Sequence, residues 1–274
     1  MHKFKMVCLD IDGTLLNSRH QITPRTKEVI GRIANEGKIA VILVSARMPQ
    51  GILFLQKELD IRQPVICYGG ALILDGDRTL HQVVMPASQV KEIYGLVKSR
   101  RIHMSLYREH VWYVEEMDGW ARQESEITGC MPVITDFAPL LEEWEKEGSG
   151  PNKVMCMAEP EDTGPLHEEI RDQYSGHLNV HLSKTTYLEI MSSGATKTSA
   201  IKFLCEKAGV AKSQVIAIGD NYNDVDMIRF AGLGIAMGNA PEDVKRHALY
   251  VTLSNDEDGV GEALRKFCSP QLPD

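Results

Sequence analysis

Runs of consecutive apolar residues recur in the first and last thirds of the chain, and each run ends at a glycine or a polar residue. Uninterrupted apolarity indicates strands that are buried on both faces, which is typical of a parallel sheet covered by helices. The runs that predict such strands are residues 5–9, 39–44, 65–67, 215–218, 234–237 and 250–252.

Helices are predicted between these strands from their start and stop signals. Thr23-Pro24 supplies a cap and a proline in the first turn of one helix, and Gly37 marks its end. Another helix covers residues 197–208 and ends at Gly209. Strands that alternate with helices predict an α/β fold with a doubly wound, mostly parallel, Rossmann-like sheet.

The middle of the chain has a different pattern, with shorter and more amphipathic segments. Such segments predict an antiparallel sheet with helices on one face, and hence a separate α+β domain. We therefore predict a core domain of residues 1–82 and 191–274, interrupted by an inserted domain of residues 83–190. The predicted elements of the insert are strands at 102–106, 111–114, 154–157, 178–182 and 187–190, helices at 89–99 and 165–174, and a charged loop at 142–152.

The composition limits the class of protein. The chain has 274 residues and a net charge of −8, so no broad nucleic-acid-binding surface is expected. No apolar run reaches the roughly 18 residues of a membrane span, and the run before Asp10 is too short for a signal-peptide core. The six cysteines are widely spaced without a Cys-x-x-Cys pair, which indicates reduced thiols. These features predict a cytoplasmic globular protein.

Four acidic residues follow two of the predicted buried strands. Asp10 and Asp12 come after the first strand, and Asp220 and Asp224 come after the strand at 215–218. The carboxyl ends of strands in an open α/β sheet line one crevice, so these carboxylates are expected to lie together. Adjacent carboxylates repel unless a cation or a shared proton intervenes, and Mg²⁺ prefers oxygen ligands. Taken alone, each acidic pair also fits an ordinary turn or the first turn of a helix.

Other strand ends carry further candidates. Ser45 and Arg47 follow the second strand, and Gly69 and Gly70 follow the third. Lys197 stands at a predicted helix start, where backbone N–H groups favour anions. In isolation, Ser45 could cap a helix, and Arg47 and Lys197 could be solvated surface charges.

The order of these motifs resembles a known family. The four motifs of the haloacid dehalogenase-like hydrolases are matched in order by Asp10-Ile11-Asp12-Gly13-Thr14, Ser45-Ala46-Arg47, Lys197 and Gly219-Asp220-x-x-Asn223-Asp224. Segments 236–240 and 254–260 resemble the Cof-type phosphatases of this family. That branch carries a type II-B α+β cap between the second and third motifs, where the inserted domain is predicted.

The resemblance implies a Mg²⁺-dependent phosphatase that forms an aspartyl-phosphate on Asp10, with Asp12 as general acid and then general base. Lys197 is implied as a third catalytic residue. The implied metal ligands are Asp10, the backbone carbonyl of Asp12, Asp220, and Asp224 directly or through water. The residues implied in phosphate or substrate binding are Ser45, Ala46, Arg47, Gly69, Gly70, Lys197 and Asn223.

Two positions depart from the family pattern. Ala46 stands where the second motif usually has glycine, so the loop is expected to avoid a positive φ there. Gly69 stands where the family often has asparagine, which affects substrate preference more than catalysis.

The implied substrate is a small cytoplasmic phosphate ester, with sugar phosphates as the first candidates. Two other functions stay open: a phosphomutase of the same superfamily, or a catalytically weak regulator that binds sugar phosphates. The inserted domain is expected to select the leaving group, and Tyr107, Arg108 and Lys184 are its candidate residues.

Overall fold

The computed structural model describes residues 4–36 and 38–268, so the predicted helix end at Gly37 lies outside the described residues. The chain divides into two compact units. Unit 1 consists of Met1–Arg47, Ile52–Leu80 and Thr196–Asp274, and unit 2 of Met48–Gly51 and His81–Ala195. Across the described parts of both units, no helix combines the length and the apolarity needed to cross a bilayer.

Unit 1 is built on an eight-stranded sheet with the order β14-β13-β12-β1-β2-β3-β4-β5. Each pair from β14 to β3 is parallel, and β4 pairs antiparallel with β3. The predicted doubly wound, mostly parallel sheet is confirmed, although the sequence pattern did not reveal β4 and β5. The strands are β1 (Met6–Asp10), β2 (Ala40–Val44), β3 (Val65–Cys67), β4 (Leu72–Asp75), β5 (Arg78–Gln82), β12 (Val215–Gly219), β13 (Leu233–Ala236) and β14 (Tyr250–Val251).

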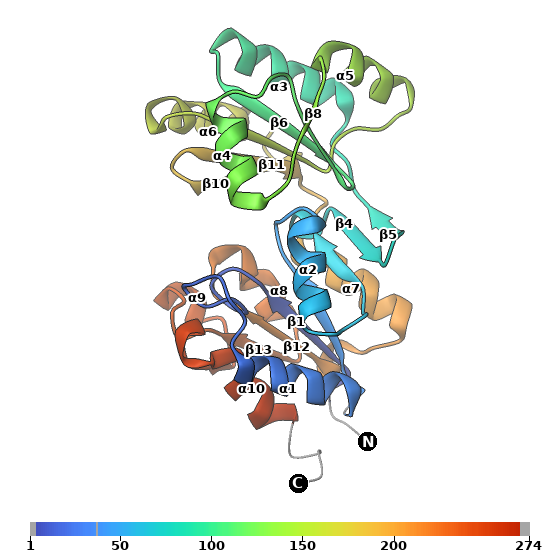
Figure 1. The fold of residues 1–274 in the computed structure, drawn as a ribbon, viewed down its shortest axis with the longest axis vertical. Helices are drawn as coiled ribbons and strands as arrows, with labels where there is room; N and C mark the ends of the chain where they lie inside the picture. Colours follow the sequence, from blue (N-terminus) through green and yellow to red (C-terminus); the bar gives the residue numbers. More distant parts are fainter. Residues whose placement is uncertain (1–3, 37, 269–274) are drawn as a thin grey trace. The chain divides into compact units, whose positions relative to one another are not determined.

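Helices cover both faces of this sheet. Apolar residues of α7 and α8 pack with β1, β2 and β12 on one face, and α1 and α10 lie side by side on the other (Figure 1). Double coverage explains why the strands are apolar without alternation. The helices are α1 (Pro24–Asn35), α2 (Gln50–Glu58), α7 (Lys197–Ala208), α8 (Val225–Phe230), α9 (Glu242–Lys245) and α10 (Gly259–Cys268), with single 3₁₀ turns η1 (Tyr68–Gly70), η2 (Lys212–Gln214), η3 (Tyr222–Asp224) and η4 (Asn255–Glu257).

The strand order brings the predicted site residues to one edge of the sheet. β1 lies between β2 and β12, and the three strands run in the same direction. Asp10 is the last residue of β1 and pairs in register with Val44, the residue before Ser45. Asp220 directly follows β12.

Unit 2 contains a six-stranded sheet with the order β10-β11-β9-β6-β7-β8, antiparallel except for the β7–β8 pair. Helices α3, α5 and α6 supply the apolar cluster on one face. Helix α4 contacts β6 and lies in front of the sheet in Figure 1, so the expectation of helices on one face only is wrong. The elements are β6 (His103–Arg108), β7 (Val111–Val114), β8 (Val133–Ile134), β9 (Lys153–Met157), β10 (Leu178–Lys184), β11 (Tyr187–Ser192), α3 (Ala87–Ser99), α4 (Gly119–Thr128), α5 (Phe137–Lys146) and α6 (Pro160–Gln173).

Two segments of unit 2 differ clearly from the prediction. The segment predicted as a charged loop from residue 142 is helical to Lys146, because Phe137, Leu141 and Trp144 form a buried stripe while the charges face outward. Helix α6 begins at Pro160 rather than Pro165. Proline is favoured at the first helical position, because a backbone N–H there would have no acceptor within the helix. The helix continues through the second proline, Pro165.

Candidate active site

Three carboxylates converge at the carboxyl edge of the unit 1 sheet. Asp10 ends β1, Asp220 follows β12, and Asp224 ends the η3 turn. One oxygen from each lies within 4.8 Å of the others. Asp10 and Asp224 are buried, at 6% and 0% exposure. The donor set consists of carboxylate oxygens alone, which are the ligands that Mg²⁺ prefers, so these residues fit the ion that the sequence implies.

Lys197 is the cation of this cluster. Its Nζ donates to Oδ1 of Asp10 at 2.5 Å and to Oδ1 of Asp224 at 2.7 Å, and its side chain is buried. The residue opens helix α7, where Thr196 and Ser199 form a capping box. Gly70 permits the close approach of this helix start, because a Cβ there would lie 2.1 Å from the carbonyl oxygen of Thr196.

The cluster carries more negative charge than its single ammonium offsets. Burial, and then the Asp224 carboxylate, raise the pKa of Asp10 well above its ordinary value against the opposing effect of Lys197. Burial also raises the pKa of Asp220 to about 6. Burial alone would lower the pKa of Lys197, but the Asp10 and Asp224 carboxylates outweigh it and raise that pKa. The imbalance favours a bound cation.

The raised pKa of Asp220 predicts how the stability of the metal-free protein depends on pH. The folded state holds this proton up to about pH 6, and the unfolded chain loses it near the ordinary value of 3.8. The contribution of Asp220 to stability therefore falls as the pH rises from about 4 to 6, and stays low above 6. We expect Asp220→Asn to become more stable than the wild type over this interval. Urea unfolding in chelator at several pH values measures the difference, and a constant difference would contradict the prediction.

Backbone geometry holds the two acids that follow β12. The second oxygen of Asp224 accepts hydrogen bonds from the backbone N–H groups of Asp220 and Asn221, both at 3.0 Å. Gly219 leaves room for this carboxylate, because a Cβ there would lie 2.5 Å from Asp224. The hydroxyl of Thr14 donates to Oδ1 of Asp220 at 2.8 Å. These contacts fix the orientation of both acids.

Asp12 lies apart from the three-carboxylate cluster and pairs with Arg47. Nε of Arg47 donates to Oδ2 of Asp12 at 2.8 Å, and Nη2 donates to Oδ1 at 2.6 Å. The Asp12 side chain is half-exposed, at 51%. This bidentate pair places an acidic group with access to solvent beside the buried Asp10.

The second motif and the third strand end supply the rest of the predicted site. Ser45 is buried, and its Oγ accepts from the backbone N–H of Arg47 at 3.2 Å. Gly69 donates its N–H to the Ser45 carbonyl at 2.9 Å. Ala46 is absent from the residues with a positive φ, as expected for alanine. Asn223 is exposed in the η3 turn.

A family model of the haloacid dehalogenase-like hydrolases matches residues 7–264. The chain belongs to this family. A Haemophilus influenzae protein, provisionally named a phosphatase, is 34% identical over 266 residues, which are 96% of this chain and 98% of the relative. The 5-amino-6-(5-phospho-D-ribitylamino)uracil phosphatase YcsE of Bacillus subtilis is 29% identical over 268 residues, 96% of this chain and 95% of the relative.

A crystal structure of a haloacid dehalogenase-like hydrolase from Bacteroides thetaiotaomicron has a TM-score of 0.86 and 32% identity, and the match covers 96% of this chain and 99% of that chain. The fold, the enzyme class of phosphatase and the resemblance to the Cof-type branch are thus confirmed.

Three residues that shape the site of this phosphatase were not predicted from its sequence. Thr14 was visible within the first motif, but its bond to Asp220 joins residues 206 positions apart and depends on the fold. Thr196 and Ser199 cap the helix that presents Lys197, and a Thr-x-x-Ser spacing could have suggested this.

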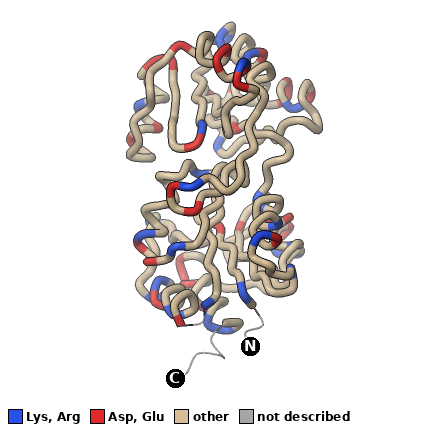
Figure 2. The backbone as a smooth tube through the Cα atoms, turned by 90° about the vertical axis from the view of Figure 1, so that its right-hand side faces the viewer, with Lys and Arg blue, Asp and Glu red and all other residues tan. Residues whose placement is uncertain are grey.

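Charges of both signs are interspersed along the backbone of the phosphatase (Figure 2). All six cysteines are free, and five of them are buried. Burial raises the pKa of the Cys8 thiol, which makes it a poor nucleophile.

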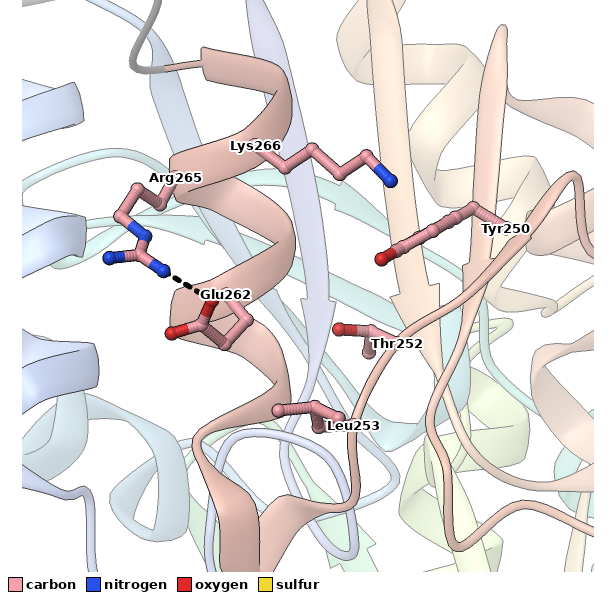
Figure 3. A pocket seen from close by; sticks show the side chains of 6 residues that line it. All are labelled: Tyr250, Thr252, Leu253, Glu262, Arg265 and Lys266. Carbon is pink, nitrogen blue, oxygen red and sulfur yellow. Dashed lines mark hydrogen bonds and ion pairs between the residues drawn. The ribbon is translucent and has the colours of Figure 1, made fainter.

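The groove beside α10 is explained by contacts within the protein. A groove of about 490 Å³ lies between β14 and α10 (Figure 3). Its charges are already partnered, because Arg265 pairs with Glu262 at 2.6 Å and Lys266 lies 4.1 Å from the Tyr250 ring.

In unit 2, His103 joins the Asp118 carboxylate at 2.8 Å and the Ser105 hydroxyl at 2.9 Å, like a hydrolytic triad. Ser105 is fully buried and accepts a hydrogen bond from the Trp112 indole at 2.9 Å, so it cannot reach a substrate.

Proposed function

We propose that this phosphatase hydrolyses small phosphomonoesters with Mg²⁺ through an aspartyl-phosphate on Asp10, and that sugar or sugar-alcohol phosphates of the cytoplasm are its substrates. The observation that carries the proposal is the buried Asp10 carboxylate, held by Lys197 within a cluster of three acids. A carboxylate that attacks phosphorus needs neighbouring positive charge to admit the phosphate.

The chain's own residues transfer the protons of the reaction and bind the phosphoryl group. The phosphoryl group is bound by Lys197 and by Ser45 at the end of β2. An Asp10 oxygen attacks phosphorus, and the ester oxygen leaves with a proton from Asp12. Asp12 then accepts a proton from the water that hydrolyses the aspartyl-phosphate.

The ion would be held by Asp10, Asp220, Asp224 and the carbonyl of Asp12, and it would offset the charge between Asp10 and the phosphate. Arg47 holds both oxygens of Asp12 in this structure. We infer that Arg47 turns to the substrate when Asp12 acts, which makes it a substrate-binding residue.

The name of one relative supports the substrate class. The Bacillus subtilis relative YcsE is named for an ester whose phosphate is attached to a ribityl chain, and the alignment with it covers 96% of this chain. A phosphate on a polyol chain has a flexible, hydroxyl-rich leaving group. We propose the same chemical class for this chain.

A phosphate-release screen tests the proposed function. Purified protein with Mg²⁺ is offered sugar phosphates, sugar-alcohol phosphates, nucleotides, flavin mononucleotide and pyridoxal phosphate. We expect release of inorganic phosphate to be fastest from the sugar and sugar-alcohol esters. Isomerised sugar phosphate without phosphate release would favour a phosphomutase, and tight binding without turnover would favour a regulator.

We further propose that unit 2 selects the leaving group. Its face opposite α3, α5 and α6 carries a buried ion pair, in which Lys153 Nζ lies 3.4 Å from Glu189 Oε2. Of the candidates, Tyr107 is buried against Trp112 and is not accessible to a substrate. Arg108, which pairs with Glu147, and the exposed Lys184 remain as candidates.

Arg108→Ala and Lys184→Ala are therefore expected to change the ranking of esters in the screen. They should hardly alter hydrolysis of a small generic ester, which makes few contacts with unit 2. Lys98→Ala is the control, because this exposed lysine lies on α3. An unchanged ranking in both variants would contradict selection by these residues.

A further inference from the structure

The C-terminal motif, Asn239 and residues 254–258, served above only to mark the Cof-type resemblance. Its residues lie next to the segment that follows the nucleophile. We propose that the asparagine and aspartate side chains of this motif form a clamp that positions the backbone of residues 13–18, and through it the Asp12 acid and the Asp12 carbonyl. The inference rests on the proposed function of Asp12 and deepens it, because it assigns positioning residues to the same site.

The clamp begins at the residue directly after Asp12. Nδ2 of Asn239 donates to the carbonyl oxygen of Gly13 at 2.9 Å, across 226 positions of sequence. Oδ1 of Asn239 accepts the backbone N–H of Asn255 at 3.0 Å. One amide side chain therefore joins the loop after β1 to the loop after β14.

Asn255 and Asp256 extend the contact along the loop. Nδ2 of Asn255 donates to the carbonyl oxygen of Leu16 at 2.9 Å. Oδ1 of Asp256 accepts the backbone N–H of Ser18 at 2.8 Å. Together with Asn239, these side chains bind the backbone of the loop at three points.

Asp258 binds the start of α1, the helix that follows this loop. Its Oδ1 accepts the hydroxyls of Thr23, which caps α1, and of Thr26, the latter at 3.3 Å. Gly238 lets the two halves of the motif approach, because a Cβ there would lie 2.7 Å from the Ser254 nitrogen. The two halves of the motif therefore lie in close contact through their backbones.

The clamped loop packs closely against the acidic cluster. Gly13 has a φ of +78°, and a Cβ there would lie 2.4 Å from Oδ2 of Asp220. Within the loop, Asp12 and Leu16 form an isolated bridge, and the Leu16 N–H donates to the Ile11 carbonyl at 2.9 Å. A shift of the Gly13 carbonyl moves the adjoining peptide groups, so it would displace Asp12 and the Thr14 hydroxyl that binds Asp220.

Three variants separate positioning from mere stability. Asn239→Asp keeps an acceptor for the Asn255 N–H but loses the donor to the Gly13 carbonyl, and Asn255→Ala removes the bond to Leu16. Glu257→Ala is the matched control. Its carboxylate lies in the same turn and binds the N–H and hydroxyl of Ser254.

Two readouts are needed, one of them independent of activity. Amide hydrogen exchange is followed over residues 13–18 in each variant with saturating Mg²⁺. Phosphate release is measured over a range of Mg²⁺ and ester concentrations. We expect the two asparagine variants to exchange faster over residues 13–18, to lose about 10- to 100-fold in kcat, as for other groups that orient metal ligands, and to need more Mg²⁺ for half-activation. KM for the ester should change little, and Glu257→Ala should match the wild type.

The clamp is overturned if exchange over residues 13–18 in the asparagine variants equals that of Glu257→Ala. It is also overturned if exchange accelerates while kcat and the Mg²⁺ requirement stay within twofold of the wild type. A wild-type protein that releases no phosphate from any ester would refute the proposed function. The exchange experiment would still decide whether the motif holds the loop.

Discussion

Asp10→Asn should lower kcat for phosphate release by at least about 10²–10⁴-fold, the loss typical of removing a catalytic group. The amide matches the carboxylate in size and can still accept the hydrogen bond from Lys197, so the fold should be kept. It lacks the anionic oxygen that attacks phosphorus. Steady-state phosphate release measures the loss of kcat, and circular dichroism checks that the fold is kept.

The matched control for this substitution is Asp243→Asn, because Asp243 is an exposed carboxylate that pairs at 2.8 Å with Arg246, the residue that follows α9. It should turn over like the wild type. Phosphate release by Asp10→Asn within a few-fold of the wild type would show that another group attacks phosphorus.

Removal of Mg²⁺ should abolish turnover, and its return should restore it. Without the ion, one ammonium offsets three carboxylates whose oxygens lie within 4.8 Å of one another, and a phosphate would add further negative charge. Activity is measured after dialysis against chelator and again after titration with Mg²⁺. Full turnover in chelator would mean that the acidic cluster has another purpose.

Substitutions and other ions refine the test of the metal site. Asp220→Ala removes one predicted ligand and should raise the Mg²⁺ concentration needed for half-maximal activity. Asp75→Ala is the control, since Asp75 pairs with Arg78 outside the cluster. Ca²⁺ should inhibit, because it prefers more ligands at longer distances and would disturb the alignment of Asp10 with the phosphate.

The convergence of Asp10, Lys197 and Asp220 could be predicted because each is tied to the end of a strand or the start of a helix. In a parallel sheet these ends meet at one edge, so local patterns determine the approximate positions. The family motifs then assigned the order and the chemistry. The helix at Lys197–Ala208 carried a stop signal in Gly209, and its predicted boundaries are confirmed.

Side-chain partners could not be predicted in the same way. The pairing of Arg47 with Asp12 and the bond from Asn239 to Gly13 depend on how loops from distant strands meet. Helix α5 was not predicted, and its C-terminal half was assigned to a loop, because its exposed charges obscured the buried stripe. Contacts of this kind follow from packing, and no local signal in the sequence specifies them.

The division of the chain also affects the order in which the protein is made. Asp10 and Lys197 are separated by 187 positions, and most of unit 2 is encoded between them. At synthesis rates of about 5–20 residues per second, roughly 10–40 s pass between the two. β1 lies in the middle of its sheet and lacks its β12 neighbour during this time. The nascent chain therefore carries a central strand with an open, apolar edge while unit 2 folds, which makes this interval the one in which mispairing and chaperone binding are most favoured.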